Sequence, residues 1–265
     1  MPLTCNIDEN PYCDSVNLFA CDEISIDPGV TILCGCNGAG KSTLLEQIAR
    51  GLGYMTETER HTAALANAIK QTHVPSKEDD SDDTCNGAND EKKDGKKPDP
   101  TVILWNAVKG RDGFIKKAFE AFDIDDISYG FEISESSEGE GTMMALGRLG
   151  RNIASETSGS ESGAPIVLLL DAIDSGLDEA NMQEFRSFMG FVSEKTNEKG
   201  HDFYLVITTN SWPMTQEWKA DAGIEPRCVL VPSLEPFDPS DYQSWRKTML
   251  SSAKRKQKRD GKLHR

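Results

Sequence analysis

The sequence predicts an α/β fold in which helices flank a mostly parallel central sheet, with a small antiparallel β-layer near the N-terminus. Two observations support this fold class. The β-branched run 30–34 leads through a Gly-rich turn into a segment with apolar residues at helical spacing. Further along, unbroken apolar runs that suit buried parallel strands alternate with amphipathic helical segments. A chain of 265 residues is long enough for one such domain and its core.

The individual elements follow from periodicity and from turn residues. Residues 18–20 and 24–26 have the composition of short strands and make up the expected β-layer, and the turn Asp27-Pro28-Gly29 leads on to the strand at 30–34. The Ser/Gly/Glu-rich stretch 155–163 is expected to be a loop. Further strands are expected at 101–105, 124–133, 166–171, 203–208 and 228–231. Helices are expected at 43–49, 58–71, 112–122, 143–149, 179–198 and 239–250.

The Gly-rich turn has the pattern of a phosphate-binding loop. Its glycines allow several backbone N–H groups to point at phosphate oxygens, and the start of the following helix adds partial positive charge. Lys41 is expected to reach the β- and γ-phosphates, and the Ser42 hydroxyl to be a ligand of Mg²⁺. The sequence therefore predicts a P-loop NTPase fold that binds a nucleotide with Mg²⁺. The residues expected to bind the nucleotide in this loop are Gly35, Asn37, Gly38, Ala39, Gly40, Lys41, Ser42 and Thr43.

A carboxylate at the end of a later strand is the second candidate for the metal. Residues 166–171 are an apolar run that ends in Asp171, as expected of a buried parallel strand whose carboxyl end faces the site. Asp171 is therefore expected to hold Mg²⁺. The alternative is an ordinary Asp that caps a helix after the strand, but the presence of Lys41 favours the metal ligand.

Composition excludes several classes of protein. The net charge of −15 argues against a protein that coats nucleic acid with its whole surface, although a local basic patch is compatible with it. The seven cysteines are odd in number and contain no CxxC pair, which argues against a zinc site or a disulfide framework. We expect a cytoplasmic protein. The start of the chain lacks a signal-peptide pattern, and the longest apolar run is too short for direct membrane insertion.

Two further segments resemble those of the ATP-binding-cassette (ABC) ATPases. Residues 168–178 read Leu-Leu-Leu-Asp-Ala-Ile-Asp-Ser-Gly-Leu-Asp and are similar to the Walker B and D-loop segment, which typically reads Leu-Leu-Asp-Glu-Pro-Thr-Ser-Gly-Leu-Asp. Residues 136–140 look like the ABC signature, with Ser137, Gly139 and Glu140 in matching positions. The phosphate loop also has the ABC form. Together with the order of the strands, the resemblance covers about 19–231.

The resemblance implies that ATP is bound within a homodimer. In the family, two ATP molecules are sandwiched between the phosphate loop of one subunit and the signature of the other. Ser137, Gly139, Glu140 and Asp178 are then expected to contact nucleotide in the dimer, and hydrolysis separates the subunits and drives a partner protein. The physics is compatible, because a helix N-terminus with a hydroxyl group is an anion site. Without the resemblance, the Ser/Glu/Gly cluster is simply a capped helix start.

The chain departs from the ABC pattern at the positions of catalysis. Ala172 stands where the family has its catalytic glutamate, and alanine cannot polarise water. Asn210 replaces the switch histidine, and Asn106 is the amide nearest to the position of the family's glutamine. Asp174 is a candidate substitute for the missing base. The sequence leaves two hypotheses open: slow hydrolysis through Asp174, or a protein that mainly binds ATP.

Three functions remain in view. The favoured one is a soluble ABC-type ATPase similar to the small relatives of the chromosome-maintenance and recombination-repair ATPases. The main alternative is the nucleotide-binding subunit of an ABC transporter, but the chain between Lys41 and Ser137 is short for the helical subdomain that grips a permease. The third is a non-hydrolysing, ATP-dependent interaction module, which Ala172 and Asn210 favour.

The domain organisation consists of an ATPase domain at 1–252 and a basic tail at 253–265. Within the domain, residues 75–100 carry acidic and lysine clusters with almost nothing apolar, so we expect a disordered insertion. An acidic tether for a partner is the alternative. The tail contains the basic run 254–259, which is either a solvated end of the chain or a contact with nucleic acid or another anionic surface.

Overall fold

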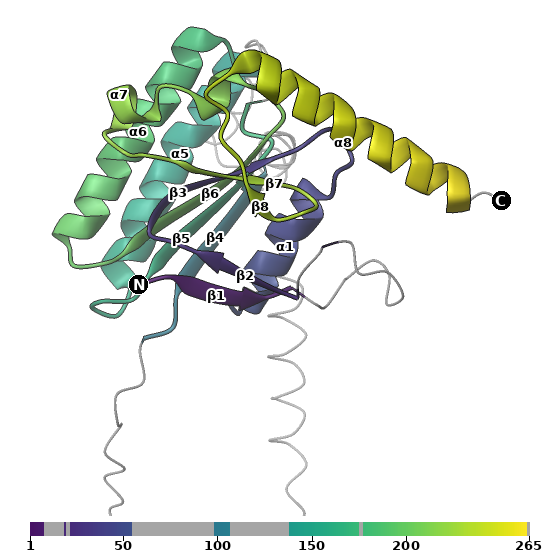
Figure 1. Cartoon of the computed structure of the whole chain (residues 1–265). Coiled ribbons are helices and arrows are strands. Elements are labelled where there is room, and N and C mark those ends of the chain that lie inside the picture. Colours follow the sequence, from purple (N-terminus) through teal and green to yellow (C-terminus); the bar gives the residue numbers. More distant parts are fainter. Residues whose placement is uncertain (8–18, 20–21, 55–97, 107–137, 175–176, 264–265) are drawn as a thin grey trace, which may run out of the picture.

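A computed structural model describes residues 1–7, 19, 22–54, 98–106, 138–174 and 177–263 of the chain (Figure 1). The helices expected at 58–71 and 112–122, the strand expected at 124–133 and nearly all of the insertion at 75–100 lie outside these residues. Those expectations therefore stay predictions. The remaining elements form the α/β fold that the sequence predicts.

The centre of the fold is a six-stranded sheet with the strand order β4-β5-β6-β3-β7-β8. All neighbouring strands are parallel except β7 and β8, which are antiparallel. Strands β5 and β6 are buried along their whole length, which explains their unbroken apolar sequences. The strands are β3 (Gly29–Cys34), β4 (Thr101–Asn106), β5 (Ile166–Asp171), β6 (Phe203–Thr209), β7 (Arg227–Leu230) and β8 (Glu235–Pro236).

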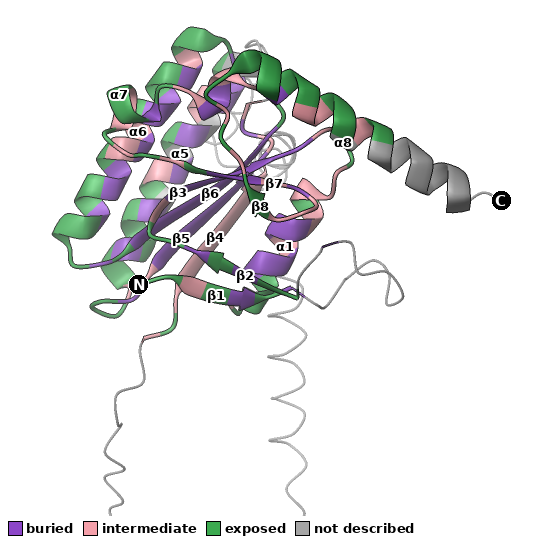
Figure 2. Cartoon of the chain, in the orientation of Figure 1, coloured by how far each residue is buried: buried purple, intermediate pink, exposed green. Residues whose placement is uncertain are grey.

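Helices cover both faces of this sheet and form two hydrophobic clusters (Figures 1 and 2). On one face, α5 (Glu138–Gly159) and α6 (Glu179–Glu198) contribute to the larger cluster. On the other, α1 (Lys41–Gly51) packs together with the small β-layer. The bounds of α6 are those that periodicity predicts. None of the helices in the described ranges combines the length and apolar character needed to span a lipid bilayer.

The small β-layer does not consist of the two strands that the sequence predicts. Strand β1 (Leu3–Asn6) pairs antiparallel with β2 (Glu23–Ile26). The expected strand at 18–20 was wrong at Phe19, which lies in a bend and is buried in the same cluster as α1; its two neighbours lie outside the described residues. The four residues of β1 are too few for periodicity to detect, and their position depends on packing against α1.

Two helices are longer than expected. Residues 155–159, expected in a loop, continue α5, and within them Thr157 and Ser158 donate hydrogen bonds from their hydroxyls to backbone carbonyls one turn earlier. The last helix, expected at 239–250, is α8 (Tyr242–Leu263) and includes the basic run 254–259. Lysine, arginine and glutamine are good helix formers, and the positive charges of lysine and arginine suit a helix C-terminus. The shorter elements are η1 (Pro213–Thr215) and α7 (Trp218–Ala222).

Two helical glycines should respond to alanine with opposite signs. A Cβ at Gly190 of α6 would lie 2.9 Å from the Cα of Ala222, whereas a Cβ at Gly147 of α5 would meet nothing within 4 Å. We expect Gly147→Ala to raise the free energy of unfolding by about 0.5–1 kcal/mol, because alanine reduces the backbone entropy of the unfolded chain. Gly190→Ala should lower the free energy of unfolding by about 1–3 kcal/mol, because the backbones at Gly190 and Ala222 would have to move apart. Urea denaturation measures both, and a stabilising Gly190→Ala would contradict the close approach of α6 and α7.

Candidate functional site

The phosphate loop connects β3 to α1 in a conformation that requires glycine. Gly38 and Gly40 have φ values of 73° and 97°, in the left-handed region that L-residues with side chains disfavour. A Cβ at Gly35 would lie 3.0 Å from the carbonyl oxygen of Val231. Helix α1 begins at Lys41 with no side-chain cap from Gly40, so its first amides face the loop. This is the geometry of an anion site at a helix N-terminus.

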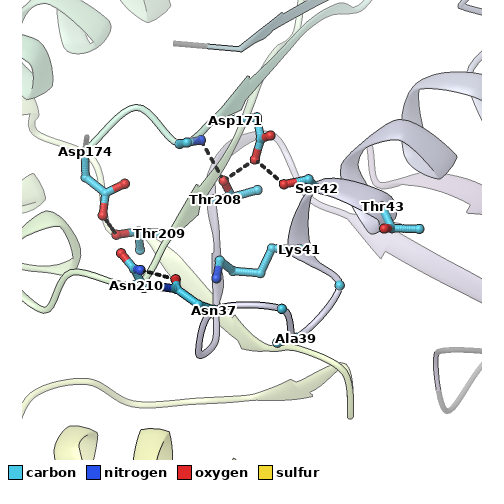
Figure 3. A pocket seen from close by; sticks show the side chains of 13 residues that line it. Asn37, Ala39, Lys41, Ser42, Thr43, Asp171, Asp174, Thr208, Thr209 and Asn210 are labelled. Carbon is cyan, nitrogen blue, oxygen red and sulfur yellow. Dashed lines mark hydrogen bonds between the residues drawn. The ribbon is translucent and has the colours of Figure 1, made fainter. Parts of the chain in front are cut away.

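A cavity of 490 Å³ lies where the carboxyl ends of the parallel strands meet this loop (Figure 3). Its volume is in the range of small-molecule sites. The cavity brings together the loop residues with Asp171, Asp174 and Asn210, all predicted from the sequence. The lining residues are Asn37, Gly38, Ala39, Gly40, Lys41, Ser42, Thr43, Asp171, Ala172, Asp174, Thr208, Thr209 and Asn210.

The Asp171 carboxylate accepts hydrogen bonds from three side chains at the cavity. Its Oδ1 accepts hydrogen bonds from Ser42 Oγ at 3.0 Å and from Thr208 Oγ1 at 2.7 Å. Its Oδ2 accepts one from Asn106 Nδ2 at 2.7 Å. Hydroxyl and carboxylate oxygens are the ligands that Mg²⁺ prefers, usually together with phosphate oxygens. The pair of Ser42 and Asp171 therefore fits the ion.

Lys41 lies within the loop. Its Nζ donates hydrogen bonds to the carbonyl oxygens of Gly35 at 2.8 Å and of Cys36 at 3.1 Å. Burial lowers the pKa of the Lys41 ammonium, and the nearby carboxylate of Asp174 opposes this effect. A phosphate group near Nζ would favour the charged form of Lys41 further. The partly buried ammonium is therefore well placed to attract an anionic ligand.

The second carboxylate of the cavity, Asp174, is anchored from the end of β6. Thr209 Oγ1 donates a hydrogen bond to Asp174 Oδ2 at 2.6 Å. Next to it, Asn210 donates from Nδ2 to Oδ1 of Asn37, which ties the end of β6 to the phosphate loop (Figure 3). Ala172 has a φ of 53°, and this turn takes the chain from β5 to Asp174 on the cavity wall.

Of the other predicted nucleotide-binding residues that the structure describes, Gly35, Gly139, Glu140 and Asp178 are not part of the cavity lining. Gly139 and Glu140 lie in the first turn of α5, and Ser137 lies outside the described residues. Asp178 is the N-cap of α6, where its Oδ1 accepts a hydrogen bond from the amide of Asn181 at 2.8 Å. Except for Gly35, their expected contacts are made in a dimer, so their roles stay predictions.

Sequence reasoning missed two lining residues, Thr208 and Thr209. They end a buried strand, as Asp171 does, but only the strand order shows that β6 lies between β3 and β5. Asn106 was noted as the amide closest to the family's glutamine position, and the register explains its contact, since it pairs directly with Asp171. The signal for all three is a polar residue at the carboxyl end of an apolar run.

Comparison with known proteins gives one family. A family model described as AAA domain matches residues 14–153, about half of the chain. The matched stretch includes the phosphate loop and Asn106 and ends before Asp171. No curated protein matches the chain.

Proposed function

Because the chain belongs to the AAA-domain family of P-loop ATPases, we propose that it is an ABC-type ATPase that dimerises around Mg·ATP, hydrolyses it slowly and thereby drives a partner protein. The observation that carries the nucleotide site is the hydrogen bond of 3.0 Å between Ser42 and Asp171, which are 129 positions apart. It places the helix after the phosphate loop against the carboxylate strand, as metal-bound triphosphate requires.

Each part of the site has a defined task in this proposal. The loop amides and Lys41 bind the phosphates. Ser42 and Asp171 hold Mg²⁺, which supplies positive charge next to the phosphate oxygens when bound. Asp174 lines the same cavity and accepts the proton of an attacking water. It takes the role that the ABC glutamate has in the resemblance, since Ala172 has no group that can act as a base.

Removal of the Lys41 ammonium should weaken ATP binding. We expect Lys41→Ala to bind fluorescent ATP about 10–150-fold more weakly in the presence of magnesium, since a hydrogen bond to a charged group contributes about 1.5–3 kcal/mol. Lys195→Ala is the matched control, because that lysine is exposed on α6, where it pairs with Glu198 and lies over the ring of Phe191, away from the cavity. Wild-type protein that shows no affinity for millimolar Mg·ATP would end the proposal.

Neutralising Asp174 should slow hydrolysis without weakening nucleotide binding. We expect Asp174→Asn to reduce phosphate release by about 10²–10⁴-fold, the usual contribution of a general base. Glu198→Gln, a change to an exposed carboxylate of α6, serves as control. Equal turnover of wild type and Asp174→Asn would exclude Asp174 as the base. Tight ATP binding with no phosphate release from wild type would instead select the non-hydrolysing interaction module.

The same variant tests dimerisation. If hydrolysis separates the subunits, Asp174→Asn should accumulate as a dimer with Mg·ATP, and the wild type should return to monomer as ATP is consumed. Light scattering after gel filtration measures the mass of both. A monomeric Asp174→Asn protein saturated with Mg·ATP would contradict the ABC-type sandwich while leaving the nucleotide site intact.

For the partners, we propose that α8 contacts nucleic acid. The helix includes the basic run 254–259, although the whole chain has a net charge of −15, and it extends away from the sheet (Figure 1). A helix of 22 residues is about 33 Å long, enough to keep a polyanion away from the acidic body.

Deleting the residues after Ser252 should therefore weaken binding of labelled DNA. The slope of log affinity against log salt should become less steep by about 0.9 per lost phosphate contact. ATP binding serves as the control, because α8 does not line the cavity. Unchanged DNA affinity at low salt would show that the basic run is only a solvated helix end.

A further inference from the structure

We propose that Thr208 and Thr209, the last two residues of β6, are positioning residues for the two carboxylates of the cavity. Thr208 orients Asp171 as a magnesium ligand, and Thr209 orients Asp174 toward the attacking water. The inference rests on the proposed function and adds to it a pair of side chains that neither the sequence motifs nor the family match singles out.

Thr208 connects a backbone amide to the metal-binding carboxylate. Its Oγ1 accepts a hydrogen bond from the amide of Ala172 at 2.9 Å and donates one to Asp171 Oδ1 at 2.7 Å. The residue is 1% exposed. A hydroxyl has a single proton, so the amide fixes its direction and the proton must point at the carboxylate. Asp171 Oδ1 is thereby held in one position as a hydrogen-bond acceptor.

Thr209 repeats this arrangement one residue later. Its Oγ1 accepts a hydrogen bond from the amide of Ser211 at 2.9 Å and donates to Asp174 Oδ2 at 2.6 Å. The carbonyl oxygen of Ser211 lies at a longer distance of 3.3 Å, so Asp174 is the better acceptor. This residue is also 1% exposed. Each of the two consecutive threonines thus accepts a hydrogen bond from a backbone amide, and its own proton is thereby directed at one carboxylate.

The strand order explains why β6 can serve both carboxylates. It lies between β3, which leads into the phosphate loop, and β5, which ends in Asp171. Its carboxyl end is therefore next to the phosphate loop on one side and to the carboxylate segment 171–174 on the other, and both threonines line the cavity. Groups that orient a metal ligand typically change metal affinity or activity by about 10–100-fold when removed.

Isosteric substitution separates the two roles. Thr208→Val should raise the magnesium concentration needed for half-maximal binding of fluorescent ATP by about 10-fold, with ATP affinity regained at saturating magnesium. Thr209→Val should lower kcat by about 10-fold and leave KM and the magnesium requirement unchanged. Thr208→Ser and Thr209→Ser keep the hydroxyl and should restore the wild-type values. Thr31→Val, at a buried threonine of β3, controls for replacing a threonine in the sheet.

The outcomes are distinguishable. Valine variants of Thr208 and Thr209 that match Thr31→Val in both assays would overturn the positioning roles, provided that Asp171→Asn and Asp174→Asn are impaired. If those two aspartate variants are unimpaired, the proposed function itself fails. Thr208→Ala and Thr209→Ala remove the same hydroxyls without added bulk and decide the matter if a valine variant does not fold. Absence of phosphate release from wild type overturns the role of Thr209, and the magnesium titration alone then decides that of Thr208.

Discussion

The hydrogen bonds of the Asp171 carboxylate connect the parts of this fold that make up the site. The side chain is 8% exposed, and a buried carboxylate without partners would be strongly destabilising. Its donors come from three different elements: Ser42 from α1, Asn106 from β4 and Thr208 from β6. Satisfying all of them at once requires β5 to lie between β4 and β6 in the observed register. The polar centre of the cavity and the apolar sheet therefore depend on the same arrangement of strands.

The sequence predicts those parts of the fold that are determined locally. The buried strand β5 is apolar up to its last residue, and helix α6 has a regular apolar stripe, so both have the bounds that the sequence predicts. The phosphate loop is recognisable because its backbone conformation needs glycine at Gly38 and Gly40. Thr208 and Thr209 are recognisable as polar residues at the end of an apolar run, but only the spatial order of the strands, which the sequence does not contain, shows that they enter the cavity.

The turn at Ala172 has a strained backbone conformation that contacts within the cavity hold in place. An L-residue in the left-handed region costs about 1–2 kcal/mol, and such strain persists where surrounding contacts hold it. Here the amide of Ala172 is held by Thr208, whose hydroxyl is itself engaged with Asp171. The strained turn and the Asp171 carboxylate are therefore one hydrogen-bonded unit. Relaxing the turn would move Asp174, so the position of the second carboxylate depends on the first.

The charges of the cavity explain why a nucleotide should bind only together with a metal ion. Among its described lining residues Lys41 is the one cation, and Asp171 and Asp174 are both acidic. A triphosphate that enters this space meets one ammonium and two carboxylates, and at close range in a partly buried site like charges repel strongly. The amides of the loop and of α1 offset part of this repulsion through their partial charges. With a divalent cation bound, Asp171 would act as a ligand rather than as a source of repulsion, so we expect removal of magnesium to weaken ATP binding more than the loss of the Lys41 ammonium does.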